Sequence, residues 1–210
     1  MALDCWRQQS LQDLSKCKAL EVGSQNGGLS LWLALQGALV VCSDLDGPTE
    51  TAVRKHREHG VSHLVSYESI DATNIPYTNH FDVILFKSVL GGIGVNDNKE
   101  RQAKAVSEMH KALKTGGELL FAENLAGSPV HGFFRRRFVK WGRDWRYISL
   151  TELDEFLAPF SKVRYRTIGF FGAFGRNEKQ RENLGELDRH LTDALVPQGW
   201  RYIVAGVATK

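Results

Sequence analysis

The sequence predicts an α/β fold built on a doubly wound parallel sheet with helices on both faces. Short runs of β-branched and aliphatic residues alternate with segments of helical length between residues 17 and 122. Two further β-rich runs, at 163–168 and 202–208, fit a pair of strands at one edge of that sheet. Neither an internal repeat nor a Pro/Ser-rich linker divides the 210 residues, so we expect a single domain over 1–210.

Two strand–helix units open the predicted sheet. The apolar run at 17–22 ends at Gly23, and the apolar segment at 29–36 reads as a buried helix that Gly37 ends. The next apolar run, 38–43, is followed by Asp44, and Pro48 with Thr49 starts a polar helix that extends to residue 59. Each unit therefore predicts a strand, a turn at its carboxyl end and a crossover helix.

Three more strands are predicted before residue 125. Residues 62–67 form a short strand candidate, and 81–86, which are apolar except at Asp82, are typical of a strand covered on both faces. Residues 99–113 have apolar side chains at helical spacing, and Gly116 and Gly117 follow them. The fifth strand is predicted at 118–122.

The remaining chain predicts two insertions beside the late strands. A basic, aromatic insertion covers about 127–149, and a helical insertion covers about 176–196, where Leu184, Leu187, Leu191 and Leu195 recur at helical spacing.

Composition and charge limit the function classes. With 42% hydrophobic residues, 24% charged residues and 5 Pro, the chain is neither disordered, collagenous nor a disulfide scaffold. Residues 1–130 contain 12 Lys+Arg against 15 Asp+Glu, whereas residues 131–210 contain 15 against 9. The second part is therefore expected either to meet an anionic molecule or to present a solvated basic surface, and nucleic acid is an improbable partner.

Cysteine usage and hydropathy predict a cytoplasmic location. Cys5, Cys17 and Cys42 are an odd number without a Cys-x-x-Cys pair, which indicates neither a disulfide framework nor a zinc cluster. The longest apolar stretch, 29–42, is too short and too interrupted to span a bilayer, and no signal pattern precedes it.

The segment at 19–28 carries the most informative motif. Glu21 ends the first strand, and Gly23 and Gly27 flank a tight turn into the following helix, which lets the backbone approach a ligand closely. Asp44 follows the second strand at the place where a carboxylate can accept hydrogen bonds from ribose hydroxyls. Asp71, after the third strand, is suited to an adenine edge. Together these residues predict a nucleoside-containing cofactor.

In these motifs the chain resembles the class I S-adenosylmethionine-dependent methyltransferases over about residues 17–125. Glu21-Val-Gly-Ser-Gln-Asn-Gly27 looks like their first motif, Asp44 and Asp71-Ala72 like their acidic positions, and 81–86 and 113–122 like their fourth strand, double glycine and fifth strand. The resemblance implies a Rossmann-like seven-stranded mixed sheet with an antiparallel last strand. It implies S-adenosylmethionine as cofactor, with S-adenosylhomocysteine as product, held by Glu21, Gly23, Ser24, Gln25, Gly27, Asp44, Leu45, Asp71, Ala72 and Lys87.

Gln25 departs from the family pattern, which usually has its middle glycine there. Its side chain would crowd the methionine end of the cofactor or line it. The same residue argues against a nucleotide dehydrogenase, whose Gly-x-Gly-x-x-Gly requires glycine at this position.

Acceptor residues are expected at the tips of strands four and five and in the insertion that follows. Ser88 follows strand four, where DNA amino-methylating enzymes of this fold have Asp/Asn-Pro-Pro-Tyr/Phe, and Glu123 and Asn124 follow strand five. Glu123 and His131 are the candidate catalytic residues, and His131 is the candidate base, although an exposed helix-cap histidine is an equal interpretation. The candidate substrate-binding residues are Ser88, Asn124, Arg135, Arg143, Tyr147 and Phe171.

Three features keep a structural interpretation open. The cations and rings of 131–147 suit an anionic, planar or sugar acceptor, but the same spacing fits a helix whose rings pack on the sheet. The aromatic loop at 170–175 can close over an acceptor or pack under the last helix. His56, His59 and His63 have metal-like spacing but no carboxylate or cysteine beside them, so we predict no metal.

These observations favour a methyltransferase for a small-molecule or sugar-type acceptor, with oxygen slightly favoured over nitrogen. One alternative is a methyltransferase acting on RNA or a lipid-linked glycan, whose binding would weaken steeply with salt. The other is a non-catalytic S-adenosylmethionine-binding partner protein. The sequence predicts no oligomeric state and no acceptor identity.

Overall fold

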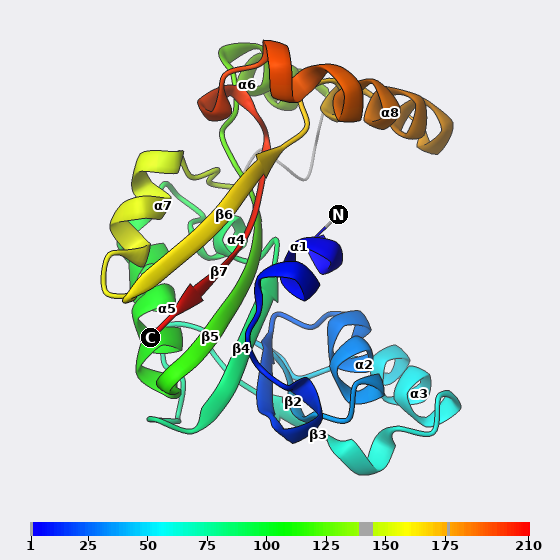
Figure 1. Ribbon diagram of the computed structural model, residues 1–210, viewed down its shortest axis with the longest axis vertical. Helices are drawn as coiled ribbons and strands as arrows, with labels where there is room; N and C mark the ends of the chain where they lie inside the picture. The colour runs from blue at the N-terminus through cyan, green and yellow to red at the C-terminus, as the bar shows by residue number, and fades with distance from the viewer. Residues whose placement is uncertain (1, 139–144, 176) are drawn as a thin grey trace.

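A computed structural model describes residues 2–138, 145–175 and 177–210. Its centre is a seven-stranded sheet in the order β3-β2-β1-β4-β5-β7-β6 (Figure 1). The strands are β1 Lys18–Val22, β2 Leu39–Asp44, β3 Val65–Ser69, β4 Phe81–Lys87, β5 Leu113–Asn124, β6 Lys162–Ile168 and β7 Ile203–Thr209. Strands β1 to β5 pair in parallel, and β7 pairs antiparallel with both β5 and β6. The predicted mixed sheet with an antiparallel last strand is confirmed.

Helices cover both faces of this sheet. They are α1 Ala2–Gln9, α2 Gly28–Leu35, α3 Glu50–Glu58, α4 Leu90–Ile93, α5 Lys99–Ala112, α6 Pro129–Phe138, α7 Leu150–Leu157 and α8 Glu178–Leu195. Helices α1, α2 and α3 lie on one side, and α5 and α7 lie on the other (Figure 1). No described helix is both long enough and apolar enough to cross a membrane.

The central strand β4 is apolar from Val83 to Phe86, where it is buried on both faces. Ile84 and Phe86 point into the core under α5 and α7, whereas Val83 and Leu85 point into the core under α1 and α2. All four side chains are at most 1% exposed. Since successive side chains of a strand face opposite sides, the four residues buried on both faces are all apolar, whereas the partly exposed Asp82 and exposed Lys87 are charged.

The structure changes several predicted boundaries. Residues 62–64 form a turn of 3-10 helix, and the third strand begins only at Val65. Strand β5 begins at Leu113, before the double glycine, because Leu113 already pairs with Phe81 of β4. Helices α1, α4 and α7 were not predicted from the sequence.

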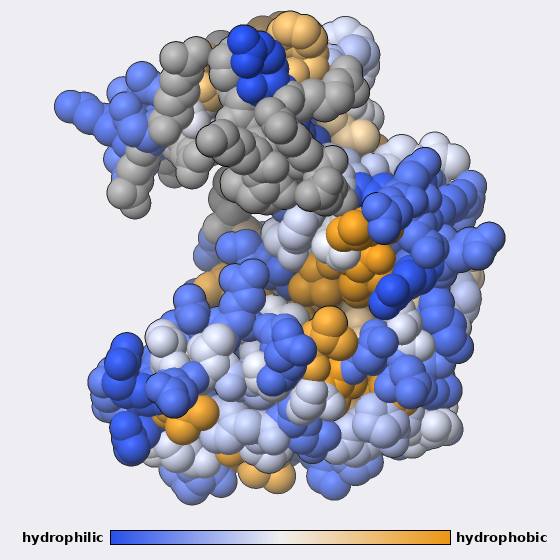
Figure 2. Space-filling model, turned by 180° about the vertical axis from the view of Figure 1, so that it is seen from behind, coloured by the Kyte–Doolittle hydropathy of each residue, from blue (hydrophilic) through white to orange (hydrophobic). Residues whose placement is uncertain are grey.

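Helices α6 and α8 lie beyond the end of strands β5 to β7 (Figure 1). Asp188 attaches α8 to the segment that follows β6. Its carboxylate accepts hydrogen bonds from the backbone N–H groups of Phe170, Phe171 and Gly172. The side of the molecule turned away in Figure 1 is hollowed at mid-height, and apolar side chains gather in the hollow (Figure 2). The predicted helical insertion at 176–196 is occupied by α8, and α6 lies in the predicted basic insertion.

Candidate functional site

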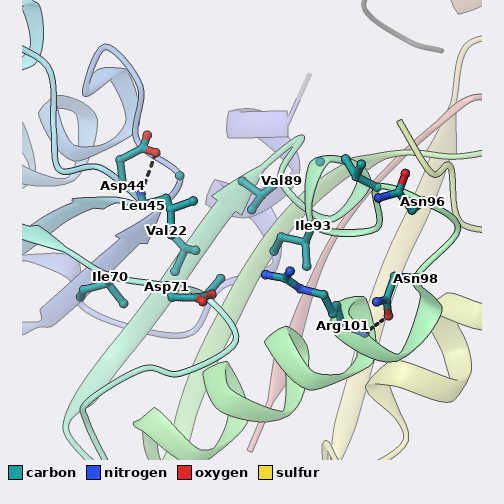
Figure 3. Close-up of a pocket in the computed structure, with 14 residues that line it drawn as sticks. Val22, Asp44, Leu45, Ile70, Asp71, Val89, Ile93, Asn96, Asn98 and Arg101 are labelled. Atoms are coloured by element: carbon teal, nitrogen blue, oxygen red, sulfur yellow. Dashed lines mark hydrogen bonds between the residues drawn. The ribbon is translucent and has the colours of Figure 1, made fainter. Parts of the chain in front are cut away.

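A pocket of about 470 Å³ opens at the carboxyl ends of β1, β2 and β3 (Figure 3). Parallel strands of this topology bring their following loops together at this edge, on either side of the point where the strand order reverses. The pocket is lined by Val22, Gly23, Asp44, Leu45, Ile70, Asp71, Ala72, Val89, Gly92, Ile93, Val95, Asn96, Asn98 and Arg101.

The glycine-containing turn between β1 and α2 approaches helix α3 very closely. Gly27 has a φ of +64° and serves as the N-cap of α2. A Cβ at this position would lie 2.8 Å from Ala52 Cβ and from the His56 ring. Gly27 is therefore required both by the left-handed backbone and by the contact with α3.

Gln25 adopts the left-handed conformation that the family's middle glycine would accept without strain. Its φ is +46°, which costs a non-glycine residue about 1–2 kcal/mol. The Gln25 backbone N–H donates a 2.7 Å hydrogen bond to Asp44 Oδ2. The Gln25 side chain is exposed and does not line the pocket.

Asp44 is held in place by two backbone amides. Besides the Gln25 N–H, the N–H of Leu45 donates to Asp44 Oδ1 at 2.8 Å. An ionised carboxylate has about four lone-pair positions, so acceptor capacity remains for a ligand in the pocket. This arrangement suits recognition of two neighbouring hydroxyl groups.

Asp71 and Arg101 face the pocket from opposite walls (Figure 3). Asp71 Oδ1 accepts hydrogen bonds from the N–H and the hydroxyl of Thr73, both at 2.8 Å. The Thr73 N–H lowers the pKa of the Asp71 carboxyl, and the charge of Arg101 contributes to the same shift. Asp71 therefore stays ionised and can accept a hydrogen bond from a ligand amine.

Residues 89–98 form the pocket wall that the sequence did not reveal. Val89, Ile93 and Val95 provide its apolar part, and Asn96 and Asn98 its polar part. No motif marks this segment, although three glycines at 91, 92 and 94 indicate close packing. Trp145 explains one of them: a Cβ on Gly91 would lie 1.5 Å from Trp145 Nε1.

Arg146 stabilises the pocket wall of residues 89–98 through contacts outside the pocket. Its guanidinium donates to Asp97 Oδ1, Gln102 Oε1 and Glu152 Oε1 at 2.7, 2.7 and 2.6 Å. Gln102 in turn donates to the carbonyl of Leu90 at 2.8 Å. The guanidinium therefore joins α5 and α7 to the loop at Asp97, and the backbone N–H of Arg146 donates to the carbonyl of Gly91 in α4 at 3.0 Å.

Glu21 and Glu123 are buried carboxyl groups that support the pocket from beneath. Glu21 Oε2 accepts the N–H of Ser30 at 2.7 Å and also bonds the Ser30 hydroxyl, at the start of α2. Glu123 accepts the N–H groups of Val89 and Leu90. Burial raises the pKa of each carboxyl to about 7. Neither lines the pocket, so both act on it through the backbone they hold.

The structure thus divides the residues predicted to hold the cofactor. Those that line the pocket are Gly23, Asp44, Leu45, Asp71 and Ala72. Those outside its lining are Glu21, Ser24, Gln25, Gly27 and Lys87. Ser24 is buried, whereas Lys87 is exposed at the end of β4.

His131 has a packing role in place of the predicted catalytic one. It belongs to the first turn of α6 and is 0% exposed. Nε2 donates to the carbonyl of Phe170 at 2.9 Å, Nδ1 accepts the N–H of Ser128 at 3.1 Å, and the ring stacks on Phe174. Burial lowers the pKa of His131. With both ring nitrogens engaged, His131 is not placed to take a proton from an acceptor.

Four of the six predicted acceptor residues form two pairs. Asn124 Nδ2 donates to Ser88 Oγ at 2.9 Å, which joins the tips of β5 and β4, and Ser88 has a φ of +55°. Arg135 lies 3.9 Å above the Tyr147 ring and donates to the carbonyls of Leu125 and Ala126. Phe171 begins the 3-10 turn that Asp188 holds. Arg143 lies outside the described residues.

The histidines with metal-like spacing have other partners. His56 is buried and bonds both Gly27 O and the Tyr67 hydroxyl, and His59 bonds the carbonyl of Lys55. Within the described ranges, no three His, Cys, Asp or Glu side chains are grouped to hold a metal ion.

Residues 20–121 match the model of a methyltransferase domain family. A comparison with curated proteins finds no match. Solved structures share the fold at low identity. An N-methyltransferase for phosphoethanolamine from Haemonchus contortus, with phosphomonomethylethanolamine and S-adenosylhomocysteine bound, is 15% identical with a TM-score of 0.68. The match covers 100% of this chain and 52% of that enzyme, so the chain spans about half its length.

Two further structures cover more of their own length. An S-adenosylmethionine-dependent methyltransferase from Mesorhizobium loti is 17% identical over 95% of this chain and 94% of its own, with a TM-score of 0.64. The [4+2]-cyclase SpnF is 19% identical over 100% of this chain and 79% of its own, with a TM-score of 0.66.

Residues 20–121 match a methyltransferase domain, and the chain has the fold of solved S-adenosylmethionine-dependent methyltransferases. The predicted resemblance is thereby confirmed for the methyltransferase domain match and for the fold.

Proposed function

We propose that this protein transfers the methyl group of S-adenosylmethionine to a small-molecule or sugar-type acceptor that carries negative charge. The observation that carries the proposal is the pocket in which Asp44 and Asp71 stand at the ends of β2 and β3, beside the left-handed turn of Gly23. These two carboxylate acceptors fit a nucleoside with two neighbouring hydroxyls and an exocyclic amine, all of which donate hydrogen bonds. The ionised state of Asp71 supports the same interpretation.

Each wall of the pocket has a separate role in this proposal. The Asp44 carboxylate accepts hydrogen bonds from the ribose hydroxyls, and the Asp71 carboxylate accepts one from the adenine amine. Leu45, Ile70 and Ile93 supply apolar surface against the base and exclude water. When bound, S-adenosylmethionine supplies an electrophilic methyl group on its sulfonium sulfur. Because methyl transfer is an in-line displacement, positioning of the acceptor provides most of the catalysis, up to about 7–11 kcal/mol.

The Ser88–Asn124 pair is the proposed acceptor-orienting element. It joins the tip of β4, which pairs with β1, to the tip of β5, and the positive φ of Ser88 is a conformation that strained functional residues often adopt. The bound phosphomonomethylethanolamine of the nematode enzyme is a small anionic molecule, which supports an acceptor of that size and charge. The oxygen acceptor remains a prediction, since no described side chain selects a hydroxyl over an amine.

The test begins with the cofactor. Calorimetric titration of S-adenosylmethionine and S-adenosylhomocysteine into the wild type, Asp44→Ala and Asp46→Ala separates the ribose anchor from a nearby exposed aspartate of equal charge. We expect Asp44→Ala to weaken both ligands more than tenfold, which is over about 1.4 kcal/mol, and Asp46→Ala to leave them within twofold. Equal effects of the two variants, or no binding to folded wild type, would refute the proposed site.

Acceptor screening with a labelled methyl donor then tests the substrate class. Phosphorylated amines, sugar phosphates and uncharged sugars form one panel, and RNA and lipid-linked glycans form the second. Methylation confined to the second panel, with binding that falls steeply with salt, would replace the small-molecule proposal.

A further inference from the structure

Three consecutive carbonyl groups of the turn between β1 and α2 accept hydrogen bonds from side chains on or next to α3. Thr49 Oγ1 donates to the carbonyl of Gln25 at 3.0 Å, and Lys55 Nζ donates to that of Asn26 at 2.8 Å. His56 Nε2 lies 2.8 Å from the carbonyl oxygen of Gly27. Each carbonyl from residue 25 to 27 therefore has a side-chain hydrogen-bond partner on or next to α3.

The geometry fixes the proton on His56. A carbonyl oxygen can only accept, so Nε2 must carry the hydrogen and donate to Gly27. Nδ1 then accepts from the Tyr67 hydroxyl, which lies 3.0 Å away on β3. The ring is 0% exposed, and it fills the space that a Cβ on Gly27 would need. His56 is therefore held by the sheet on one side and holds the turn on the other.

Thr49 has two partners at one position. It is the N-cap of α3, and its Oγ1 accepts the N–H of Ala52 at 3.2 Å while donating to Gln25. The start of α3 and the turn are therefore fixed by the same hydroxyl. This couples the position of the helix to the conformation of the turn.

These contacts also determine where the amide hydrogens point. The C=O and N–H of a trans peptide unit point in opposite directions, so the carbonyls turned toward α3 turn the N–H groups of Asn26 and Gly28 away from it. Next to them, the Gln25 N–H reaches the Asp44 carboxylate at 2.7 Å. The chain of contacts therefore runs from α3 through the turn to the pocket wall.

We propose that Thr49, Lys55 and His56 are positioning residues, a carbonyl clamp that holds the turn and the Asp44 carboxylate in their cofactor-binding arrangement. The clamp maintains the left-handed backbone at Gln25, where glycine would need no such support. This inference rests on the use of S-adenosylmethionine as cofactor and is independent of the acceptor.

Lys55 offers the cleanest test because it is only half-buried and bonds the turn alone. Lys55→Met removes the hydrogen bond, Lys55→Arg keeps a donor, and Arg57→Met removes an exposed positive charge from the same helix as the matched control. Calorimetric titration with S-adenosylhomocysteine gives the affinity, and thermal unfolding gives the stability of each variant. We expect Lys55→Met to weaken binding at least fivefold, and the other two to stay within twofold.

Gln25→Gly tests whether the clamp acts through the backbone conformation. Glycine adopts a positive φ without strain, so we expect the fivefold loss of Lys55→Met to shrink to twofold or less when Gln25→Gly is added. An unchanged loss in the glycine background would overturn the proposal, as would equal affinities of Lys55→Met and Arg57→Met.

The result also separates this inference from the proposed reaction. Tight binding by wild type with no effect of Lys55→Met rejects the clamp and leaves the cofactor site intact. A clear effect of Lys55→Met without any methylated acceptor supports the clamp and rejects the proposed acceptor class. Absence of binding by folded wild type rejects both.

Discussion

The carboxylate of Glu123 accepts the backbone N–H of Leu90 at 2.7 Å, joining the end of β5 to the first turn of α4. The same oxygen accepts the N–H of Val89 at 2.9 Å, and the other oxygen accepts that of Asn124 at 2.7 Å. Three amides therefore converge on one side chain that is 2% exposed. Residue 123 was predicted as catalytic, but its contacts place it behind the pocket wall rather than in the pocket.

Removal of Glu123 is expected to loosen that wall. Glu123→Ala leaves the N–H groups of Val89, Leu90 and Asn124 without their shared acceptor, and each unsatisfied buried donor costs about 1–3 kcal/mol. We expect the free energy of unfolding to fall by at least about 2 kcal/mol in urea titrations. Glu155→Ala is the control, because Glu155 pairs with Lys99 at the surface, and we expect less than about 1 kcal/mol there. Similar losses in both variants would contradict the assigned role.

The pH dependence of stability should reveal the buried carboxyl of Glu21. Its pKa in the folded protein is about 7 because of burial, against 4.5 in an unfolded chain. Between these values the folded state binds more protons than the unfolded state, so this group lowers stability as pH rises from 4.5 to 7. Glu21→Gln removes the titration. We expect its stability relative to wild type to rise with pH by at most about 3 kcal/mol.

Urea unfolding of Glu21→Gln and wild type at half-unit pH steps measures this difference. Glu58→Gln is a suitable control, since Glu58 is exposed beside Arg54 on α3. A difference between wild type and Glu21→Gln that stays flat from pH 4.5 to 7 would show that Glu21 titrates normally.

Asp71 should determine which base the pocket prefers. As an ionised acceptor it suits the amine of adenine, whereas Asp71→Asn can present an amide donor to the carbonyl of hypoxanthine. We expect the ratio of affinities for S-adenosylhomocysteine and S-inosylhomocysteine to shift at least tenfold toward the inosine compound. Competition calorimetry with both ligands measures the ratio. An equal loss for the two ligands would mean that Asp71 does not face the base.

Gly91 and Gly92 provide a matched test of the contact with Trp145. A Cβ on Gly91 would lie 1.5 Å from Trp145 Nε1, whereas one on Gly92 would lie 3.5 Å from Cζ3 of the same ring. Gly91→Ala should therefore destabilise the protein by about 1–3 kcal/mol through overpacking, and Gly92→Ala should be tolerated. Trp145→Leu added to Gly91→Ala should restore part of the loss. Equal stability of the two alanine variants would place Trp145 elsewhere.

Local patterns of apolar and polar residues were sufficient to predict most of the strands. The mostly apolar run of β4 and the acids at the ends of β1 and β2 are short-range signals, and the structure has the corresponding strands there. The start of β5 was missed because pairing of Leu113 with Phe81 is a long-range contact that no local signal marks. Helix α4 was missed because its four residues include two glycines, which disfavour a helix by propensity.

Only part of the pocket lining could be predicted from the sequence. Asp44, Asp71 and Gly23 follow strands, so topology alone brings them together. Arg101 and Asn98 belong to the start of α5 and reach the pocket only through tertiary packing. His131 shows the converse error: a histidine in a predicted loop is compatible with a base, and only the packed rings of Phe170 and Phe174 show that it is enclosed.

The position of β7 has a consequence for synthesis. It is the last of the seven strands along the chain, yet it lies inside the sheet, between β5 and β6. In the described sheet β6 pairs only with β7, so β6 leaves the ribosome before its sole neighbour exists. The edge of β5 that pairs with β7 likewise stays unpaired until β7 has been synthesised. A nascent chain that pauses before Ile203 therefore exposes two unpaired strand edges, which is the state that chaperones recognise and that aggregates when they are absent.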